Sequence, residues 1–191
     1  LVKGVAEGCR QSSCALLGGE TANMPDVYAK DDFDMAGFCV GVVELKRAIN
    51  PSFVKAGDII LGLASHGIHS NGYTLVRKIV ESAKLDLFKS YEALNPPAKS
   101  NRKKVAKKKS ANGPKPLGEV LLTPTRIYAQ SIAKMLKNYR VKNVVTGMAH
   151  ITGSGMEGNL CRALPPHLDA VVDVKSWPVL PVFNFLQEHG N

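Results

Sequence analysis

The 191-residue sequence lacks several features that mark particular classes of protein. Its longest apolar runs are far shorter than the ~20 residues that a membrane-spanning helix needs. No basic segment followed by an apolar one opens the chain as a secretion signal would. Aromatic residues make up only 6% of the sequence, so Val, Leu, Ile and Ala must fill the core. These absences predict a soluble, cytoplasmic protein with an aliphatic core.

Cysteine is also scarce, and its spacing excludes the common metal-binding motifs. The four cysteines are far apart or flanked by apolar and small residues, and they are Cys9, Cys14, Cys39 and Cys161. No pair has the close spacing of a zinc site. We therefore expect buried, reduced thiols, as is usual in a reducing compartment.

Acidic residues are absent from one long segment, which explains the net charge of +9. Residues 95–116 contain eight Lys or Arg and four Pro, leaving 17 basic against 16 acidic residues elsewhere. Such a composition predicts a disordered, solvated insert. The segment has no aromatic residues on which bases could stack, which argues against a nucleic-acid partner.

Outside the insert, apolar periodicity alternates between the helical and the extended pattern. Helices are expected at residues 1–11, 75–83, 124–139 and 181–189, and strands at 13–17, 35–44, 58–64, 143–152 and 168–174. This alternation predicts an α/β (α+β) fold with mixed sheets packed against helices. A turn at residues 55–58 suggests a boundary between domains at 1–55 and 56–191.

The most informative segment is the polar turn between the expected strand at 58–64 and the expected helix at 75–83. It holds two Gly, two His, two Ser and one Asn within residues 65–72. Amide groups at a helix N-terminus have no partner within the helix and attract anions such as phosphate. An ordinary turn capped by Ser70 or Asn71 explains the composition equally well.

Two further polar turns follow expected strands. Gly153-Ser154-Gly155 exposes backbone amides, and Arg162 follows shortly afterwards. Glu20 and Thr21 follow the expected strand at 13–17. The Glu20 carboxylate is of the type that binds Mg²⁺, and the alternative is an ordinary solvated glutamate. In α/β folds, ligand sites form at the carboxyl ends of strands, so three such turns point to a binding site.

These residues resemble one enzyme family, aminoimidazole ribonucleotide synthetase, also called phosphoribosylformylglycinamidine cyclo-ligase. GGETANMP (residues 18–25) and HSNGYTLVRK (69–78) are the most specific segments. LLTPTRIYAQSI (121–132) and AHITGSGMEGNLCRALP (149–165) follow in the order of that family. The resemblance covers nearly everything except the basic insert.

The resemblance implies a fragment of a two-domain ligase. The full enzyme would use ATP and Mg²⁺ to cyclise formylglycinamidine ribonucleotide to aminoimidazole ribonucleotide in purine biosynthesis, as a homodimer. Residues 1–55 would be the C-terminal part of its N-terminal, nucleotide-binding and dimerising domain, and residues 56–191 would be most of its C-terminal domain, with the basic insert at 95–116. The implied roles are catalytic for His69 and Asn71, nucleotide-binding for Glu20 and Thr21, metal-binding for Glu20, and substrate- or phosphate-binding for Ser70, Gly72, Gly153, Ser154, Gly155 and Arg162.

The sequence also departs from the family pattern. The family's N-terminal ATP-binding segment and its C-terminal end lie outside the 191 residues, so we expect the fragment alone to be inactive. In GSGMEGNLCR (153–162), Ser154 replaces a glycine and Gly158 stands where a glutamate is expected. Two alternatives remain open: a non-catalytic module for dimerisation or binding, and another ATP-dependent member of the same superfamily.

Overall fold

The structure is a computed structural model that describes residues 1–95, 113–139 and 144–190. The chain divides into two compact units. Unit 1 consists of residues 1–53 and 127–148, and unit 2 of residues 54–126 and 149–191. The division into domains at 1–55 and 56–191 stays a prediction about the whole protein.

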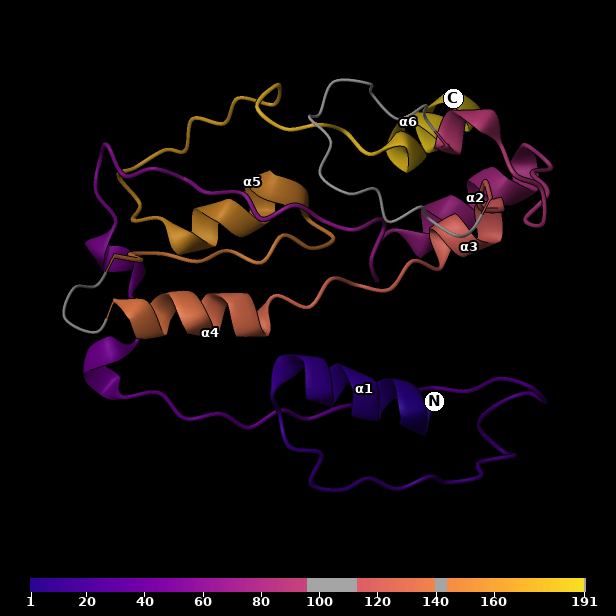
Figure 1. Cartoon of the computed structure of the whole chain (residues 1–191), viewed down its shortest axis with the longest axis horizontal. Helices are drawn as coiled ribbons and strands as arrows, with labels where there is room; N and C mark the ends of the chain where they lie inside the picture. The colour runs from indigo at the N-terminus through magenta and orange to yellow at the C-terminus, as the bar shows by residue number, and fades with distance from the viewer. Residues whose placement is uncertain (96–112, 140–143, 191) are drawn as a thin grey trace. The chain divides into compact units, whose positions relative to one another are not determined.

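Helices are the regular elements of both units (Figure 1). Unit 1 contains α1 (Val2–Ser12), η1 (Leu45–Arg47), η2 (Pro51–Phe53) and α4 (Ala129–Asn138). Unit 2 contains α2 (Tyr73–Ser82), η3 (Glu92–Leu94), α3 (Leu117–Leu121), α5 (Gly155–Leu160), η4 (Cys161–Ala163) and α6 (Pro181–His189). In the described part of the chain, every helix is too short or too polar to cross a lipid bilayer.

The helices predicted from periodicity are present, and the differences have local causes. α6 spans the expected residues, starting with Pro181, whose fixed φ suits the first helical turn. α4 begins at Ala129 rather than at Pro124. The backbone N–H of Arg126 donates to His69 instead, so the segment before α4 is held by contacts outside the helix.

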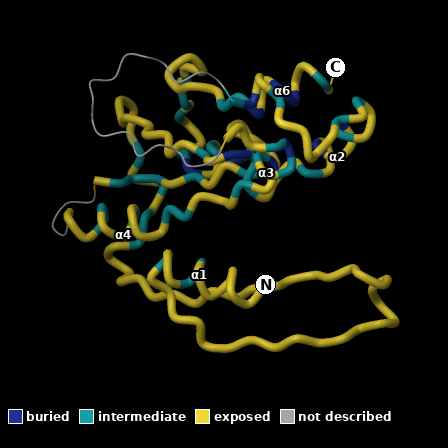
Figure 2. The backbone as a smooth tube through the Cα atoms, turned by 45° about the vertical axis from the view of Figure 1, so that its right-hand side comes forward, coloured by how far each residue is buried: buried dark blue, intermediate teal, exposed yellow. Residues whose placement is uncertain are grey.

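The core of unit 2 joins segments from across its sequence. α2, η3, α3 and α6 together contribute eight buried side chains, Val76, Ile79, Leu94, Leu117, Leu121, Val182, Phe185 and Leu186. The buried colour in Figure 2 lies largely along these helices. The core is aliphatic apart from one Phe, as the low aromatic content predicted.

The two ends of the basic insert are fixed beside this core. Residues 96–112 lie outside the described residues, so the expected disorder concerns a segment that the structure does not describe. On the described side, the Lys115 N–H donates to Asn95 Oδ1 at 3.2 Å, and Ser90 Oγ donates to the Pro114 carbonyl at 2.9 Å. The insert therefore leaves and re-enters unit 2 at one place.

The predicted mixed sheets are absent, and the α/β fold class was wrong for this structure. Within residues 1–95, 113–139 and 144–190 there is no β-strand. None of the described residues in the segments expected to form strands is in a β-strand, and Phe38 and Val42 are 100% and 101% exposed. A strand exists only through a ladder of hydrogen bonds to a neighbouring strand, and no such ladder forms among the described residues. Helices need no such partner, because they bond within themselves.

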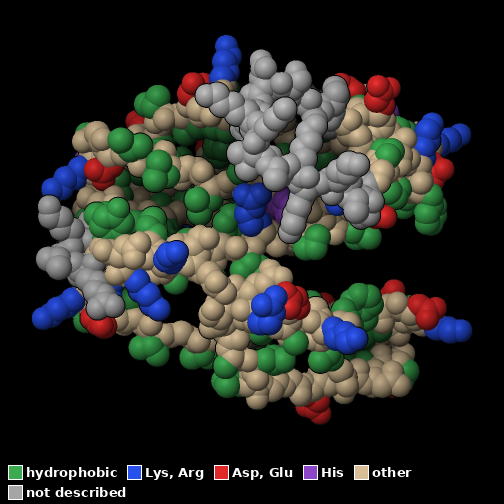
Figure 3. Space-filling view, in the orientation of Figure 1, with side chains coloured by type: hydrophobic (Ala, Val, Ile, Leu, Met, Phe, Trp, Pro, Cys, Tyr) green, Lys and Arg blue, Asp and Glu red, His purple; other side chains and the backbone are tan. Residues whose placement is uncertain are grey.

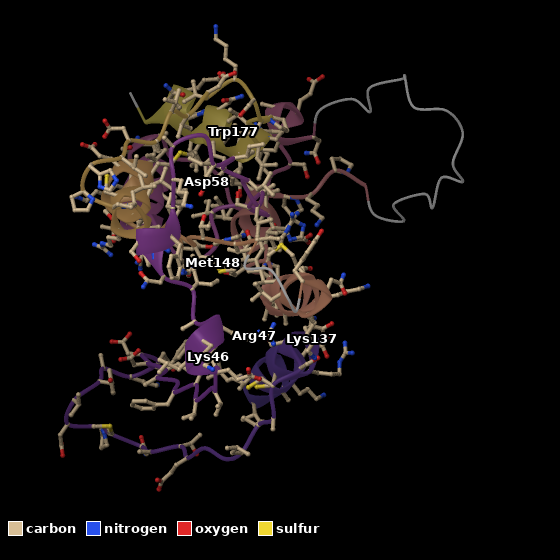
Figure 4. All side chains as sticks on the ribbon, turned by 90° about the vertical axis from the view of Figure 1, so that its left-hand side faces the viewer. Lys46, Arg47, Asp58, Lys137, Met148 and Trp177 are labelled. Carbon is tan, nitrogen blue, oxygen red and sulfur yellow. The ribbon has the colours of Figure 1, made fainter. Side chains whose placement is uncertain are left out.

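Unit 1 is held mainly by helix contacts. α1 packs against α4. The guanidinium of Arg47 donates to the Leu136 carbonyl of α4 at 3.2 Å, and Figure 4 shows Arg47 near Lys137 of that helix. Hydrophobic side chains lie at the surface of this unit in Figure 3, in agreement with its exposed Val, Leu and Phe side chains.

The prediction of buried thiols was wrong for most of the cysteines. Cys14, Cys39 and Cys161 are exposed, and Cys9 is half-buried. Cys14 and Cys39 belong to the extended segments that were expected to pack inside sheets. Without the sheets, nothing in the described residues covers these thiols.

Leu117 is the most buried side chain of the core, with 0% exposure, and its truncation should destabilise unit 2. We expect Leu117→Ala in the full-length protein to lower the free energy of unfolding by about 2–5 kcal/mol, the usual cost of a large-to-small core change. Leu122→Ala is the matched control, because Leu122 is 75% exposed. Urea unfolding measures both, and equal midpoints for the two variants would contradict this description of the core.

Candidate functional site

The polar turn at residues 65–72 is held within unit 2 by two of its residues, Gly67 and Ile68. Ile68 packs against the apolar core. Gly67 is buried, and a β-carbon built on it would lie 3.6 Å from Thr123 Cβ. His69 directly follows these two held residues, at a position where the backbone has the unusual φ of 62°. A left-handed φ costs a non-glycine residue about 1–2 kcal/mol, so other contacts must hold it.

Two backbone hydrogen bonds hold the His69 imidazole. The His66 N–H donates to His69 Nε2 at 2.9 Å, and the Arg126 N–H donates to the same atom at 3.3 Å. An imidazole nitrogen that accepts hydrogen bonds carries no proton. The neutral tautomer of His69 is thus the one protonated at Nδ1.

The surroundings of His69 also favour its neutral form. Burial lowers the pKa of His69 below the ordinary histidine value, and the nearby His66, Arg126 and His150 lower it further. Burial acts against the charged imidazolium, and neighbouring positive charges repel it. His69 therefore remains an acceptor around neutral pH.

The start of α2 carries no side-chain cap. Its N-cap is Gly72, at φ 85°, and neither Ser70 nor Asn71 bonds to the first amides of the helix. The alternative of a capped turn was therefore wrong, and Gly72 is needed for its left-handed backbone. Ser70 and Asn71 are exposed in front of the helix.

The second turn, at residues 152–155, is organised by the buried side chain of Asn159. Asn159 Nδ2 donates to Ser154 Oγ at 2.9 Å and to the Gly155 carbonyl at 2.7 Å. The Thr152 hydroxyl donates to Asn159 Oδ1 at 3.1 Å. Asn159 is the one buried polar residue among the described residues, with 5% exposure, and it binds the turn at three points.

The structure brings the two turns together. A β-carbon built on Gly153 would lie 3.9 Å from Asn71 Oδ1, so the side chain of Asn71 faces the backbone of the second turn. Residues more than 80 positions apart in the sequence thus form one polar surface in unit 2. Backbone amides, an amide side chain and imidazoles suit a ligand that carries phosphate or other polar oxygens.

Other predicted site residues are placed differently. Arg162 is exposed in η4, and within the described residues it makes no hydrogen bond or ion pair. Glu20 and Thr21 are exposed in unit 1. Two residues near His69 were missed, Arg126 and His150. Both lie in segments that carry the family resemblance, TPTRIY and AHITGSG, so that resemblance was the signal available for them.

The described residues do not fit a protein-held metal ion. No group of three or more His, Cys, Asp or Glu side chains gathers in residues 1–95, 113–139 and 144–190. Glu20 alone offers a single carboxylate, whereas a protein cage for a divalent cation needs several oxygen ligands. The expectation of a metal at Glu20 therefore has no supporting geometry.

Comparison with known proteins places the chain in a family. Residues 55–189 match the family described as "AIR synthase related protein, C-terminal domain". The chain belongs to this family of AIR synthase related proteins, and the matched residues include both polar turns.

The similar proteins are more specific. Over all of this chain, the phosphoribosylformylglycinamidine cyclo-ligases of Geobacillus kaustophilus and Geobacillus sp. strain WCH70 are 48% and 47% identical to it. The enzyme of the same name from Bacillus cereus strain G9842 is 45% identical. The chain spans 49% of the length of each, about half of the relatives that it matches.

The lowered pKa of His69 predicts a pH-dependent stability. A histidine whose pKa is lower in the folded than in the unfolded state stabilises the protein fully above its unfolded pKa. This contribution is lost as the pH falls below about 6.5 and through the folded pKa. We therefore expect the melting temperature of the full-length protein to fall more steeply on acidification than that of His69→Gln.

Thermal melts between about pH 7.5 and about pH 5.5 measure this difference. The glutamine side chain keeps an acceptor oxygen for the two N–H groups but does not titrate. All other titratable groups are the same in both proteins, so the difference in slope isolates His69. Equal slopes would show that the imidazole is not held in its neutral form.

Proposed function

We propose that the full-length protein is a phosphoribosylformylglycinamidine cyclo-ligase. It would cyclise formylglycinamidine ribonucleotide to aminoimidazole ribonucleotide with ATP in purine biosynthesis, in the cytoplasm. The observation that carries the proposal is the contact between the Asn71 turn and the Gly153 turn. It lies in a chain that is 48% identical over its whole length to one such cyclo-ligase.

The reaction needs a phosphoryl transfer followed by a ring closure. ATP phosphorylates the oxygen of the formyl amide, giving an iminophosphate and ADP. The amidine nitrogen then attacks the activated carbon, and inorganic phosphate leaves with the former amide oxygen. Such chemistry depends mainly on positioning and on stabilising the charge of the phosphoryl group.

The residues of unit 2 are suited to these tasks. His69 is a neutral imidazole held at Nε2, and Asn71 offers an amide beside it, so both can orient a polar substrate. The backbone amides of Gly153 and Ser154 and the side chain of Ser70 are candidates for the phosphate of the ribonucleotide, whereas the Gly155 N–H donates to the Thr152 carbonyl at 2.9 Å and shapes the turn. Gly72 keeps the start of α2 open, and Arg162 is exposed and available for an anion.

Glu20 and Thr21 of unit 1 are the candidates for contact with the nucleotide. ATP is used in cells as its Mg²⁺ complex, and Mg²⁺ usually keeps several waters and takes few protein ligands. A single carboxylate such as Glu20 suits that arrangement better than a site for free metal.

The direct test is an assay of the full-length protein with formylglycinamidine ribonucleotide and ATP. We expect aminoimidazole ribonucleotide and ADP to form in equal amounts, measured by chromatography. ADP without the ring-closed product would instead support another ATP-dependent reaction. Absence of both products would leave only a binding role.

His69→Ala tests the leading site residue. We expect turnover to fall on the order of 10²-fold or more, the lower range for one positioned polar or acid–base group. His66→Ala should change turnover by less than about tenfold, because the N–H that His66 donates to His69 belongs to the backbone. Circular dichroism must show that both variants stay folded. Equal turnover in His69→Ala and the wild type would remove this assignment.

A homodimer is the proposed assembly. The extended segment at residues 35–43 exposes a series of large apolar side chains, Met35, Phe38, Val40, Val42 and Val43. Monomeric proteins rarely leave so many apolar groups in contact with water, and a second copy of the chain would cover them.

Sedimentation of the full-length protein at micromolar concentration tests this assembly. We expect a dimer for the wild type and a shift toward monomer for Phe38→Glu, since a buried unpaired carboxylate is costly. Phe88→Glu should leave the dimer intact, because Phe88 is 92% exposed but lies outside the segment. A wild-type monomer would count against the proposal.

A further inference from the structure

Ser154 and Gly158 occupy one space at the start of α5. A β-carbon built on Gly158 would lie 2.6 Å from Ser154 Cβ and 2.6 Å from Ser154 Oγ. No other atom lies within 4 Å of that position, apart from the glycine's chain neighbours and the backbone of the helix itself. The serine hydroxyl can rotate away, but its β-carbon is fixed by the backbone. Any side chain at residue 158 therefore requires the turn to move.

The same two positions are departures from the family pattern noted in the sequence. Residue 154 is a serine and residue 158 is a glycine, where the family resemblance given above implies a glycine and a glutamate. The clash gives a physical reason for finding both changes in one chain. A serine at 154 is compatible with the observed turn only when residue 158 has no side chain.

The hydroxyl that Ser154 brings is used inside the turn. It accepts a hydrogen bond from Asn159 Nδ2, while the same amide group also donates to the Gly155 carbonyl. Asn159 is 5% exposed, so its amide has to find partners within the protein. Ser154 gives the amide a second acceptor next to the Gly155 carbonyl, and this restrains the turn.

We propose that Ser154, Gly158 and Asn159 act together as a positioning unit. The serine at residue 154, which fits only because residue 158 is a glycine, fixes the turn at residues 152–155 beside Asn71. Ser154 acts through the backbone of this turn rather than through direct contact with the reacting atoms. The effect on the ligand rests on the function proposed above, because the turn is a candidate for the substrate phosphate. The coupling between residues 154 and 158 does not depend on that function.

The first experiment measures thermal stability of the full-length protein and needs no activity. Gly158→Ala should lower the melting temperature in the presence of Ser154, because the added methyl group meets the serine. In the Ser154→Gly background, the same change should leave the melting temperature unchanged or raise it. There the space is open, and alanine favours a helix more than glycine does. Met156→Ala, on the exposed side of α5, is the control for a change elsewhere in the helix.

The second experiment measures the kinetics of the same variants. Gly158→Ala alone should raise KM for formylglycinamidine ribonucleotide on the order of tenfold, a typical coupling between residues in contact. The change in kcat should be smaller, because the turn orients the substrate without taking part in the chemistry. Adding Ser154→Gly should remove most of the rise in KM, while Met156→Ala should leave both constants unchanged.

The outcomes separate the two proposals. A loss of melting temperature on Gly158→Ala that is equal in both backgrounds would overturn the pairing of Ser154 with Gly158. If the melting temperature is rescued but KM does not change in any variant, the positioning role is overturned. Ser154 and Gly158 would then be a purely structural pair. If the wild-type protein has no cyclo-ligase activity, the proposed function and the positioning role both fail. The thermal experiment still decides the pairing.

Discussion

The burial of Leu117 and its neighbours is the constraint on which the candidate site depends. Leu117 joins the end of the basic insert to a core that also holds α2 and α6, and Ile68 packs against the same core. Ile68 immediately precedes His69, so the apolar contact fixes the position of a polar turn. An exposed turn of small residues would otherwise lose this geometry to conformational entropy. Hydrophobic packing therefore places the polar groups, and the polar groups define the site.

Once the turn is fixed, its hydrogen bonds decide the chemistry that it can offer. Two backbone N–H groups point at His69 Nε2, and this leaves the imidazole neutral and oriented. Burial keeps the pKa of His69 low, and Arg126, which supplies one of these N–H groups, adds a nearby positive charge that lowers it further. The arginine thus carries the positive charge at this turn, and the histidine is the fixed acceptor. Separate groups perform the two tasks because one imidazole cannot be both a fixed acceptor and a cation.

The sequence predicted the local features of the fold well. The turn at residues 55–58 forms with the Asp58 N–H donating to the Lys55 carbonyl at 3.1 Å, and Gly57 has φ 93°. The α6 residues Val182, Phe185 and Leu186 are buried as their spacing predicted. These features depend on residues within a few positions of each other, whose preferences the sequence states directly.

The prediction of sheets was wrong because strand pairing is not a local property of the sequence. The alternation at residues 35–44 indicates a chain that can extend, but a strand also needs a neighbour with free N–H and C=O groups. The described residues do not explain why positions 38 and 42 are apolar, since the side chains of Phe38 and Val42 are fully exposed. Periodicity indicates that a segment can form a strand, but it does not identify the segment with which that strand would pair.

The candidate site shows the same limit at a smaller scale. The two glycine-containing turns were predicted from composition, and their contact through Asn71 and Gly153 then followed from the fold. The positioning role of Ser154 could not be predicted from the sequence. It depends on Gly158, which has no side chain where the Ser154 side chain lies. In the sequence the two departures look like two losses from a binding motif. In three dimensions the Ser154 side chain fills the space that a side chain at residue 158 would need, so the two positions have to be considered together.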